Sequence, residues 1–266
     1  MAPPSAHELL SGLQNVLTQQ GLDYERIIQD FGQVAASEAR ANGRVFDLRD
    51  HVRGLLLSQL SNQRPWKPIA QNLCKISRIF LAYDPDALQQ AKPESLANAV
   101  CTIRCGNRSI LQQMNALAGN IATLRRLEQD FGSLDSFVTS DSPFAIARTL
   151  STSRRYKMNF VGPALALEYL RNVGIRAAKP DVHVLRILGG ERLGYFHGQP
   201  TEEQAVTLVA GLADESGCNA TYFDNLLWLF CATNYGNICG ARPRCGVCRF
   251  RQSCRHPADH PVLSGS

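Results

Sequence analysis

The chain has 266 residues, enough for one large domain or for two lobes with a buried core. Its residues are 44% hydrophobic and 19% charged, which is an ordinary composition for a globular protein and excludes an intrinsically disordered chain. The net charge of +5 is compatible with nucleic acid as a partner. No apolar run is long enough to span a membrane, and the N-terminus lacks the features of a signal peptide. We therefore expect a cytoplasmic protein without a membrane partner.

Helical periodicity runs through nearly the whole chain. Ser5 and Glu8 form a capping box ahead of an apolar stripe made of Leu9, Leu10, Leu13, Val16 and Leu17. A second amphipathic helix is predicted from Ile110 to Phe131, with Gly132 ending it. A third contains Leu226, Leu227 and Phe230. No segment alternates for long enough to be a strand, so the predicted fold is all-α with two helical lobes.

A turn between two helices is predicted at Val161-Gly162-Pro163. Glycine permits a tight backbone, and proline suits the first turn of a helix. The free N–H groups at such a helix start can bind a phosphate, although an ordinary interhelix turn would have the same residues.

Asp181 follows Pro180 and opens the apolar segment Val182–Leu188. Its simplest role is that of a helix N-cap. A carboxylate fixed in this way is also suited to stabilise a positively charged, oxocarbenium-like transition state or to activate water.

Four of the nine cysteines lie close together, with the spacing C-x5-C-x2-C-x5-C: Cys239, Cys245, Cys248 and Cys254. Structural zinc sites usually combine two separated C-x2-C pairs, whereas this segment has one. The spacing favours a 4Fe-4S cluster, in which each thiolate binds a separate iron, and zinc is the alternative. The remaining cysteines are interpreted as core residues, and only Cys231 is near enough in sequence to be a rival ligand: Cys74, Cys101, Cys105, Cys218 and Cys231.

Arginines accompany these cysteines. A loop held rigid by a cluster would present Arg242 and Arg244 to phosphates at little entropic cost. A solvated charged loop is the alternative interpretation.

Three features in order resemble the endonuclease III branch of the helix-hairpin-helix DNA glycosylases. They are Val161-Gly162, then Asp181-Val-His-Val-Leu-Arg186, then the C-terminal cysteine loop. Leu55–Gln63 resembles the early helix and DNA-contacting turn of that family, and Arg242–Cys248 resembles the middle of its cluster loop. The resemblance extends over residues 50 to 255.

The resemblance implies a fold and a division of the chain. N-terminal helices (1–48) would pack with the C-terminal lobe (176–266), which carries the cluster loop at 239–254. A central helical domain (49–175) would end in the helix-hairpin-helix. The expected protein is monomeric and nucleoid-associated, binds double-stranded DNA and contains a 4Fe-4S cluster.

The resemblance also implies roles for individual residues. Asp181 would act on a base flipped out of the duplex into a cleft between the lobes. The hairpin residues Val161, Gly162 and Ala164 would hold the DNA backbone. The gap left by the flipped base would be filled from Gln59, Asn62 and Gln63, for which polar residues at a helix end are the simpler interpretation.

Three positions depart from the family pattern. The hairpin reads Met158-Asn-Phe-Val-Gly162 instead of Leu-Pro-Gly-Val-Gly, which predicts a less tight first turn. The gap after Cys239 is one residue shorter than usual. Ala164 stands where bifunctional members have a lysine nucleophile, which predicts hydrolysis by water and an intact abasic site.

The resulting hypothesis is a monofunctional DNA glycosylase that acts on a damaged, mismatched or modified base. Four alternatives stay open. They are a glycosylase of phage-type hypermodified bases, a bifunctional glycosylase and abasic-site lyase, a non-catalytic iron–sulfur DNA-binding protein, and a zinc module joined to an unrelated helical domain.

Overall fold

The computed structural model describes residues 2–256, and these residues form helices and loops without a strand. They divide into two compact units. One contains residues 1–29 and 177–266, and the other contains residues 30–176. We call them the terminal unit and the central unit. Among the described residues, no helix combines the length and apolar character needed to cross a membrane.

The terminal unit is built from helices at both ends of the chain. It contains α1 (Ala6–Gln19), most of α2 (Tyr24–Phe31), α13 (Val182–Leu188), α14 (Glu202–Glu215), α15 (Ala220–Cys231) and a 3-10 turn, η2 (Cys245–Val247). The predicted capping box of α1 is confirmed, because the Ser5 hydroxyl accepts from the Glu8 backbone while the Glu8 carboxylate accepts from the Ser5 backbone. The apolar faces of α1, α13 and α14 pack on α15, which is buried along most of its length.

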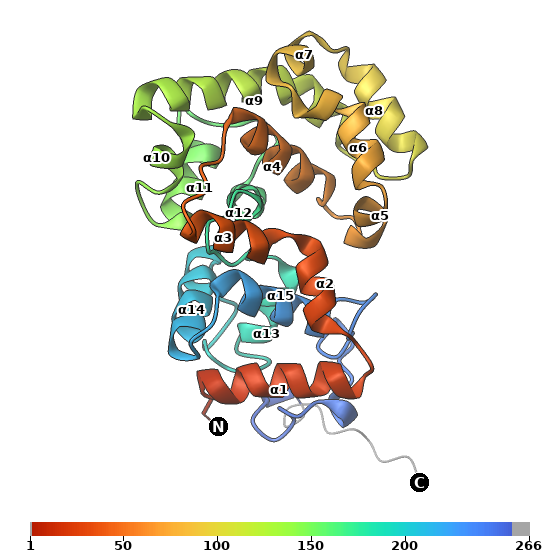
Figure 1. Ribbon diagram of the computed structural model, residues 1–266. Coiled ribbons are helices and arrows are strands. Elements are labelled where there is room, and N and C mark those ends of the chain that lie inside the picture. Colours follow the sequence, from red (N-terminus) through yellow and green to blue (C-terminus); the bar gives the residue numbers. More distant parts are fainter. Residues whose placement is uncertain (1, 257–266) are drawn as a thin grey trace. The chain divides into compact units, whose positions relative to one another are not determined.

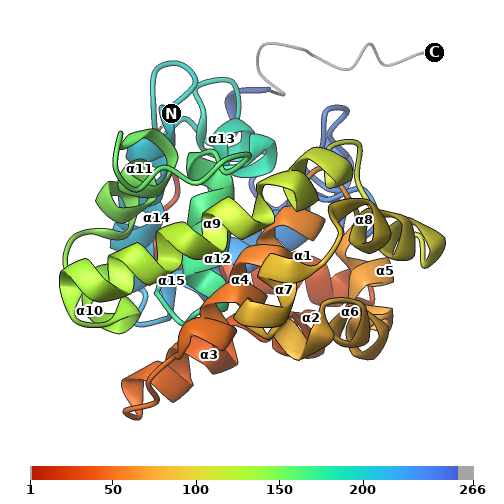
Figure 2. The same cartoon turned by 90° about the horizontal axis from the view of Figure 1, so that it is seen from above.

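The central unit contains the remaining helices. They are α3 (Gln33–Ala41), α4 (Leu48–Leu60), α5 (Trp66–Gln71), α6 (Leu73–Ile79), η1 (Leu81–Tyr83), α7 (Pro85–Gln90), α8 (Pro93–Thr102), α9 (Ile110–Phe131), α10 (Leu134–Val138), α11 (Pro143–Thr152) and α12 (Pro163–Asn172). The predicted helix from Ile110 to Phe131 is confirmed as α9, and Gly132 ends it at φ +80°. Figure 1 shows α12 almost end-on between α3 and α4, and Figure 2 shows the length of α9.

The two units divide at positions 29/30 and 176/177, whereas the predicted divisions lie at 48/49 and 175/176. Helix α3 belongs to the central unit because it packs on α12, and because its polar side chains form hydrogen bonds and an ion pair with other residues of that unit. Arg40 donates to the carbonyl of Val173 and forms an ion pair of 2.7 Å with Asp135. Gln33 donates to Glu168 and to Asn172. These long-range hydrogen bonds are invisible in helical periodicity.

Candidate active site and DNA-binding elements

Asp181 is the N-cap of α13. Its Oδ1 accepts hydrogen bonds from the backbone N–H groups of His183 (2.8 Å) and Val184 (3.1 Å). Its Oδ2 forms no hydrogen bond with a described residue, and the side chain is partly exposed. Capping therefore fixes the carboxylate through Oδ1 and leaves Oδ2 without a hydrogen-bond partner among the described residues.

An aromatic row begins two residues after Asp181. The His183 ring meets Trp228 edge-on at 6.4 Å, and Trp228 meets Tyr235 at 5.0 Å. Burial lowers the pKa of His183, and its buried Nδ1 has no hydrogen-bond partner among the described residues. A neutral imidazole with an unused nitrogen thus stands beside the carboxylate. Sequence reasoning did not single out this row, although the spacing Asp-x-His was visible.

The hairpin joins α11 to α12 in the central unit. Val161 is buried, and exposed Gly162 is the N-cap of α12 at φ −85° and ψ 175°. Because glycine has no side chain to cap the helix, the backbone N–H groups of the first turn, including that of Ala164, are not capped by a side chain. This is the arrangement that a phosphate group fits.

Asn120 on α9 holds the hairpin turn. Its side-chain oxygen accepts from the backbone N–H of Asn159 at 2.8 Å, and its Nδ2 donates to the Asn159 carbonyl at 3.0 Å. Asn120 is buried, and the Met158 N–H donates to the Leu150 carbonyl at 2.7 Å. The first turn is therefore fixed from two sides, and Phe160 within it has φ +58°.

The residues predicted to fill the gap of a flipped base have different surroundings. Gln59 is fully buried in α4, and neither atom of its amide has a hydrogen-bond partner among the described residues. The Asn107 side chain donates to the backbone carbonyl of Gln59 at 2.7 Å and to the side-chain oxygen of Gln113 at 3.1 Å. Asn62 is half-buried and Gln63 is exposed at φ +53°, in the turn after α4. Of the three, Gln63 is the most accessible.

The other three cysteines of the C-terminal loop influence the thiol of Cys248 electrostatically. Burial raises the pKa of Cys248 to about 12, and its thiol interacts electrostatically with Cys239, Cys254 and Cys245. None of the cysteines forms a disulfide. A hydrogen bond from the neighbouring thiol of Cys231 lowers the pKa of Cys239, so the rival ligand lies directly beside the loop.

No three His, Cys, Asp or Glu side chains among the described residues form a group compact enough to hold a metal ion. Thiolates around a single zinc lie within about 4 Å of one another, since each Zn–S bond is about 2.3 Å long. A cubane cluster binds each cysteine at a separate iron and so suits a wider set of sulfurs.

The loop packs on α1 and carries exposed arginines. The Phe250 ring lies against Gly12, where an added Cβ would stand 2.4 Å from the ring. Arg242 is exposed and pairs with no described residue, whereas Arg244 donates to the Gln20 side chain at 2.9 Å and to the Gly236 carbonyl at 3.4 Å. Arg242 is therefore the freer of the two predicted phosphate ligands.

Basic residues in the central unit were missed by sequence reasoning. This unit has 19 Lys and Arg against 12 Asp and Glu, whereas the terminal unit has 9 against 11. Three segments of the central unit, 54–83, 95–127 and 142–167, each contain four basic residues and no acidic residue. The local count of carboxylates was the signal that could have revealed them.

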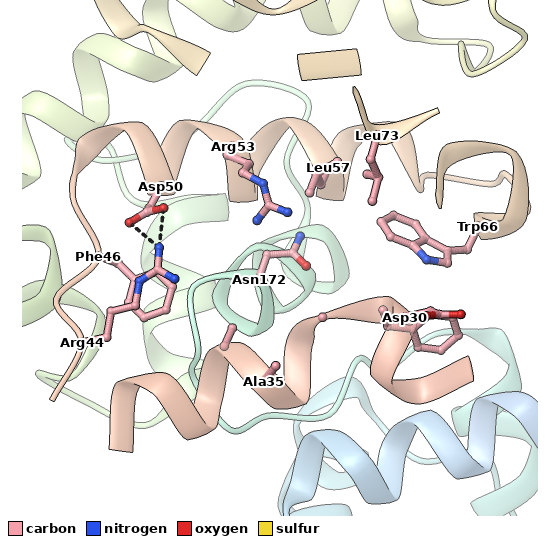
Figure 3. A pocket seen from close by; sticks show the side chains of 13 residues that line it. Asp30, Ala35, Arg44, Phe46, Asp50, Arg53, Leu57, Trp66, Leu73 and Asn172 are labelled. Carbon is pink, nitrogen blue, oxygen red and sulfur yellow. Dashed lines mark hydrogen bonds and ion pairs between the residues drawn. The ribbon is translucent and has the colours of Figure 1, made fainter. Parts of the chain in front are cut away.

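A pocket of ≈ 270 Å³ also lies within the central unit. Figure 3 shows the Trp66 indole at one end, near Leu73, and the Arg53 guanidinium and Asn172 amide directed toward the same space. Phe31 packs edge-on against Trp66 at 6.3 Å, and Arg44 pairs with Asp50 at 2.9 Å. Three aromatic side chains, Phe31, Phe46 and Trp66, line this pocket together with several hydrogen-bonding groups.

No protein-family model and no curated protein matches the chain. Solved structures do resemble it. The 8-oxoguanine DNA glycosylase of Thermotoga maritima has a TM-score of 0.54 and 20% identity, over 86% of this chain and 97% of that chain. The 8-oxoguanine DNA glycosylase of Methanocaldococcus jannaschii has a TM-score of 0.54 and 17% identity, over 86% and 96%.

A third similar structure is the Methanocaldococcus jannaschii glycosylase/lyase in complex with a 15mer DNA containing 8-oxoguanine. Its TM-score is 0.53 and its identity 17%, over 84% of this chain and 97% of that chain. These similarities extend through both units, and they confirm the predicted fold. The chain has the all-α fold of these three structures.

Proposed function

We propose that this protein is a monofunctional DNA glycosylase. The observation that carries the proposal is the Asp181 carboxylate, fixed through Oδ1 at the start of α13 with Oδ2 left for chemistry. In a glycosylase fold, such a carboxylate stabilises the positive charge that develops on the sugar as the base leaves, or takes a proton from the attacking water.

Water is the proposed nucleophile because Ala164, in the first turn of α12, has no amine. Hydrolysis would leave an intact abasic site. The uncapped start of α12 and the basic segments of the central unit would hold the DNA strand through its phosphates.

A direct test uses duplexes that each carry one altered base. The panel comprises 8-oxoguanine, adenine opposite an oxidised purine, a deaminated base, an alkylated base and a bulky modified cytosine. The similar enzymes make 8-oxoguanine the first substrate to test, and activity on the bulky cytosine alone would indicate defence against phage DNA. We expect strand breaks after alkali only. Binding without release of any base would contradict catalysis.

A lyase is the second candidate, since one similar protein is named a glycosylase/lyase. Two lysines could replace the missing nucleophile. Lys157 is exposed in the hairpin loop, and half-buried Lys179 precedes Asp181 by two residues. Borohydride added to the protein with an abasic-site duplex would trap a Schiff base. We expect no trapped adduct. An adduct lost in Lys179→Ala but kept in Lys157→Ala would assign the lyase to Lys179.

We further propose that Cys239, Cys245, Cys248 and Cys254 bind a 4Fe-4S cluster. The cluster would supply a rigid support for the loop whose arginines face solvent. The protein should be brown and contain iron and sulfide, and Cys248→Ser should lose both while Cys74→Ser, at an exposed cysteine far from the loop in sequence, retains them. Stoichiometric zinc without iron would contradict the cluster.

A further inference from the structure

Phe160 has a backbone conformation that its side chain disfavours. Its φ of +58° lies in the left-handed region, where a residue with a Cβ is strained and glycine is not. The surrounding fold imposes this conformation. Asn120 binds both backbone groups of Asn159, and the side chains of Met158 and Val161 are buried on either side.

About half of the Phe160 side chain lies outside the protein. The Phe160 side chain is 52% exposed, and it forms no ring contact with another described residue. No ring contact in the described part of the chain therefore offsets the strain of this turn. A strained backbone that holds a half-exposed ring points to a contact of this ring outside the chain.

The charges around the ring indicate what that contact is. Arg154 and Lys157, in the same loop, are exposed and form no ion pair with a described residue. Residues 142–167 include no carboxylate, and the uncapped first turn of α12 begins directly after the hairpin. A polyanion with apolar surface between its charges fits this combination, as a DNA strand does with its phosphates and sugars.

Resting on the proposed function, we propose that Phe160 is a positioning residue that packs on a deoxyribose of the strand held by the hairpin. The contact adds an apolar, salt-independent contribution to binding. It also fixes the strand's register, because the ring is held by a backbone that cannot relax.

The test measures affinity of the full-length protein for an unmodified duplex and for an abasic-site duplex at several salt concentrations. Phe160→Gly should raise the melting temperature, because the strain is relieved, and should weaken binding about fivefold or more with an unchanged salt slope. Lys157→Ala should instead lower the slope by about 0.9. Val45→Ala, which truncates a 71% exposed apolar side chain, is the control for general surface effects.

Phe160→Asn keeps the tolerance for positive φ and removes the ring, so it decides the question if the glycine variant folds poorly. Binding equal to wild type in either folded variant would overturn the proposal, as would a loss matched by Val45→Ala. Failure of the proposed function is separate. A wild-type protein that binds DNA but releases no base would disprove the glycosylase while the Phe160 comparison still stands.

Discussion

The two units differ in where their charge lies. The central unit has an excess of seven basic residues, from 19 basic and 12 acidic, and three of its segments have no carboxylate. The terminal unit has more acidic than basic residues, and five of its nine basic residues are arginines between 242 and 255. It also holds Asp181 and the four clustered cysteines. The contrast places the proposed attraction for DNA and the proposed chemistry mainly in different units.

Because of this division, we expect substitutions in the two units to have different effects. Changes in the central unit should alter affinity, stability and salt dependence, and changes at Asp181 should alter the rate of base release. The predictions that follow either separate these effects or show that the separation is wrong.

The largest effect is expected for Asp181→Asn. Asparagine caps a helix about as well as aspartate, so α13 should persist. Loss of the negative charge should slow single-turnover base release by a factor on the order of 100 or more while affinity for DNA stays nearly unchanged. Asp214→Asn, at an exposed carboxylate of the same unit, should retain the wild-type rate. A large loss of affinity in Asp181→Asn would place the terminal unit among the binding elements.

The second largest effect is expected for Asn120→Ala, at the residue that supports the hairpin in the central unit. Asn120→Ala removes two hydrogen bonds to the backbone of Asn159 and should lower the free energy of unfolding by about 1–3 kcal/mol. DNA affinity should fall with it, and the rate of base release from bound DNA should change little. Asn115→Ala, at an exposed asparagine of the same helix, is the matched control for urea unfolding. Equal stability of the two variants would show that the hydrogen bonds between Asn120 and Asn159 do not stabilise the turn.

A buried charge network predicts how the central unit responds to acid. Burial raises the pKa of Asp135, but the His51 ring, Arg40 and the Phe46 N–H outweigh this and lower the pKa to about 2. Because the folded pKa lies below the unfolded value of 3.8, the stabilisation is present above pH 3.8 and is lost as the pH falls toward 2. Because the carboxylate is partly exposed and solvent screens its interactions, the loss should stay below about 2 kcal/mol.

His51 acts in the same direction at higher pH. Burial lowers its pKa, so the unfolded chain takes up a proton first and stability declines as the pH falls below about 6.5. Urea unfolding from pH 7 to pH 2 measures both steps. Asp135→Asn should abolish the loss of stability between pH 3.8 and pH 2 and keep the loss that begins near pH 6.5. If both losses persist in this variant, Asp135 does not cause the loss at low pH.

The smallest effect compares one exposed arginine from each unit. Arg108→Ala in the central unit and Arg242→Ala in the terminal unit should each reduce the dependence of log affinity on log salt by about 0.9 if each contacts one phosphate. Neither should alter the chemical step. An unchanged slope for Arg242 with a reduced slope for Arg108 would sharpen the division between the units, and the reverse result would break it.

Much of the fold follows from the sequence because helix starts and ends depend on interactions between residues that are close in the chain. The capping box at Ser5, the glycine that ends α9 and the proline that begins α12 act on neighbours within one helical turn. The N-cap role of Asp181 is local in the same way. The order of hairpin, aspartate and cysteines predicted a fold that comparison with solved structures confirms.

Only the tertiary structure decided what each side chain contacts. Gln59 was predicted to fill the gap left by a flipped base, and it is buried with its amide unpaired, because every residue of α4 from 54 to 60 is buried. The left-handed conformation of Phe160 depends on Asn120, which is 40 positions earlier in the chain, and the division at residue 29/30 depends on hydrogen bonds between α3 and α12. Such contacts join residues distant in sequence, and neither periodicity nor spacing encodes them, because both describe only what a residue does to its near neighbours.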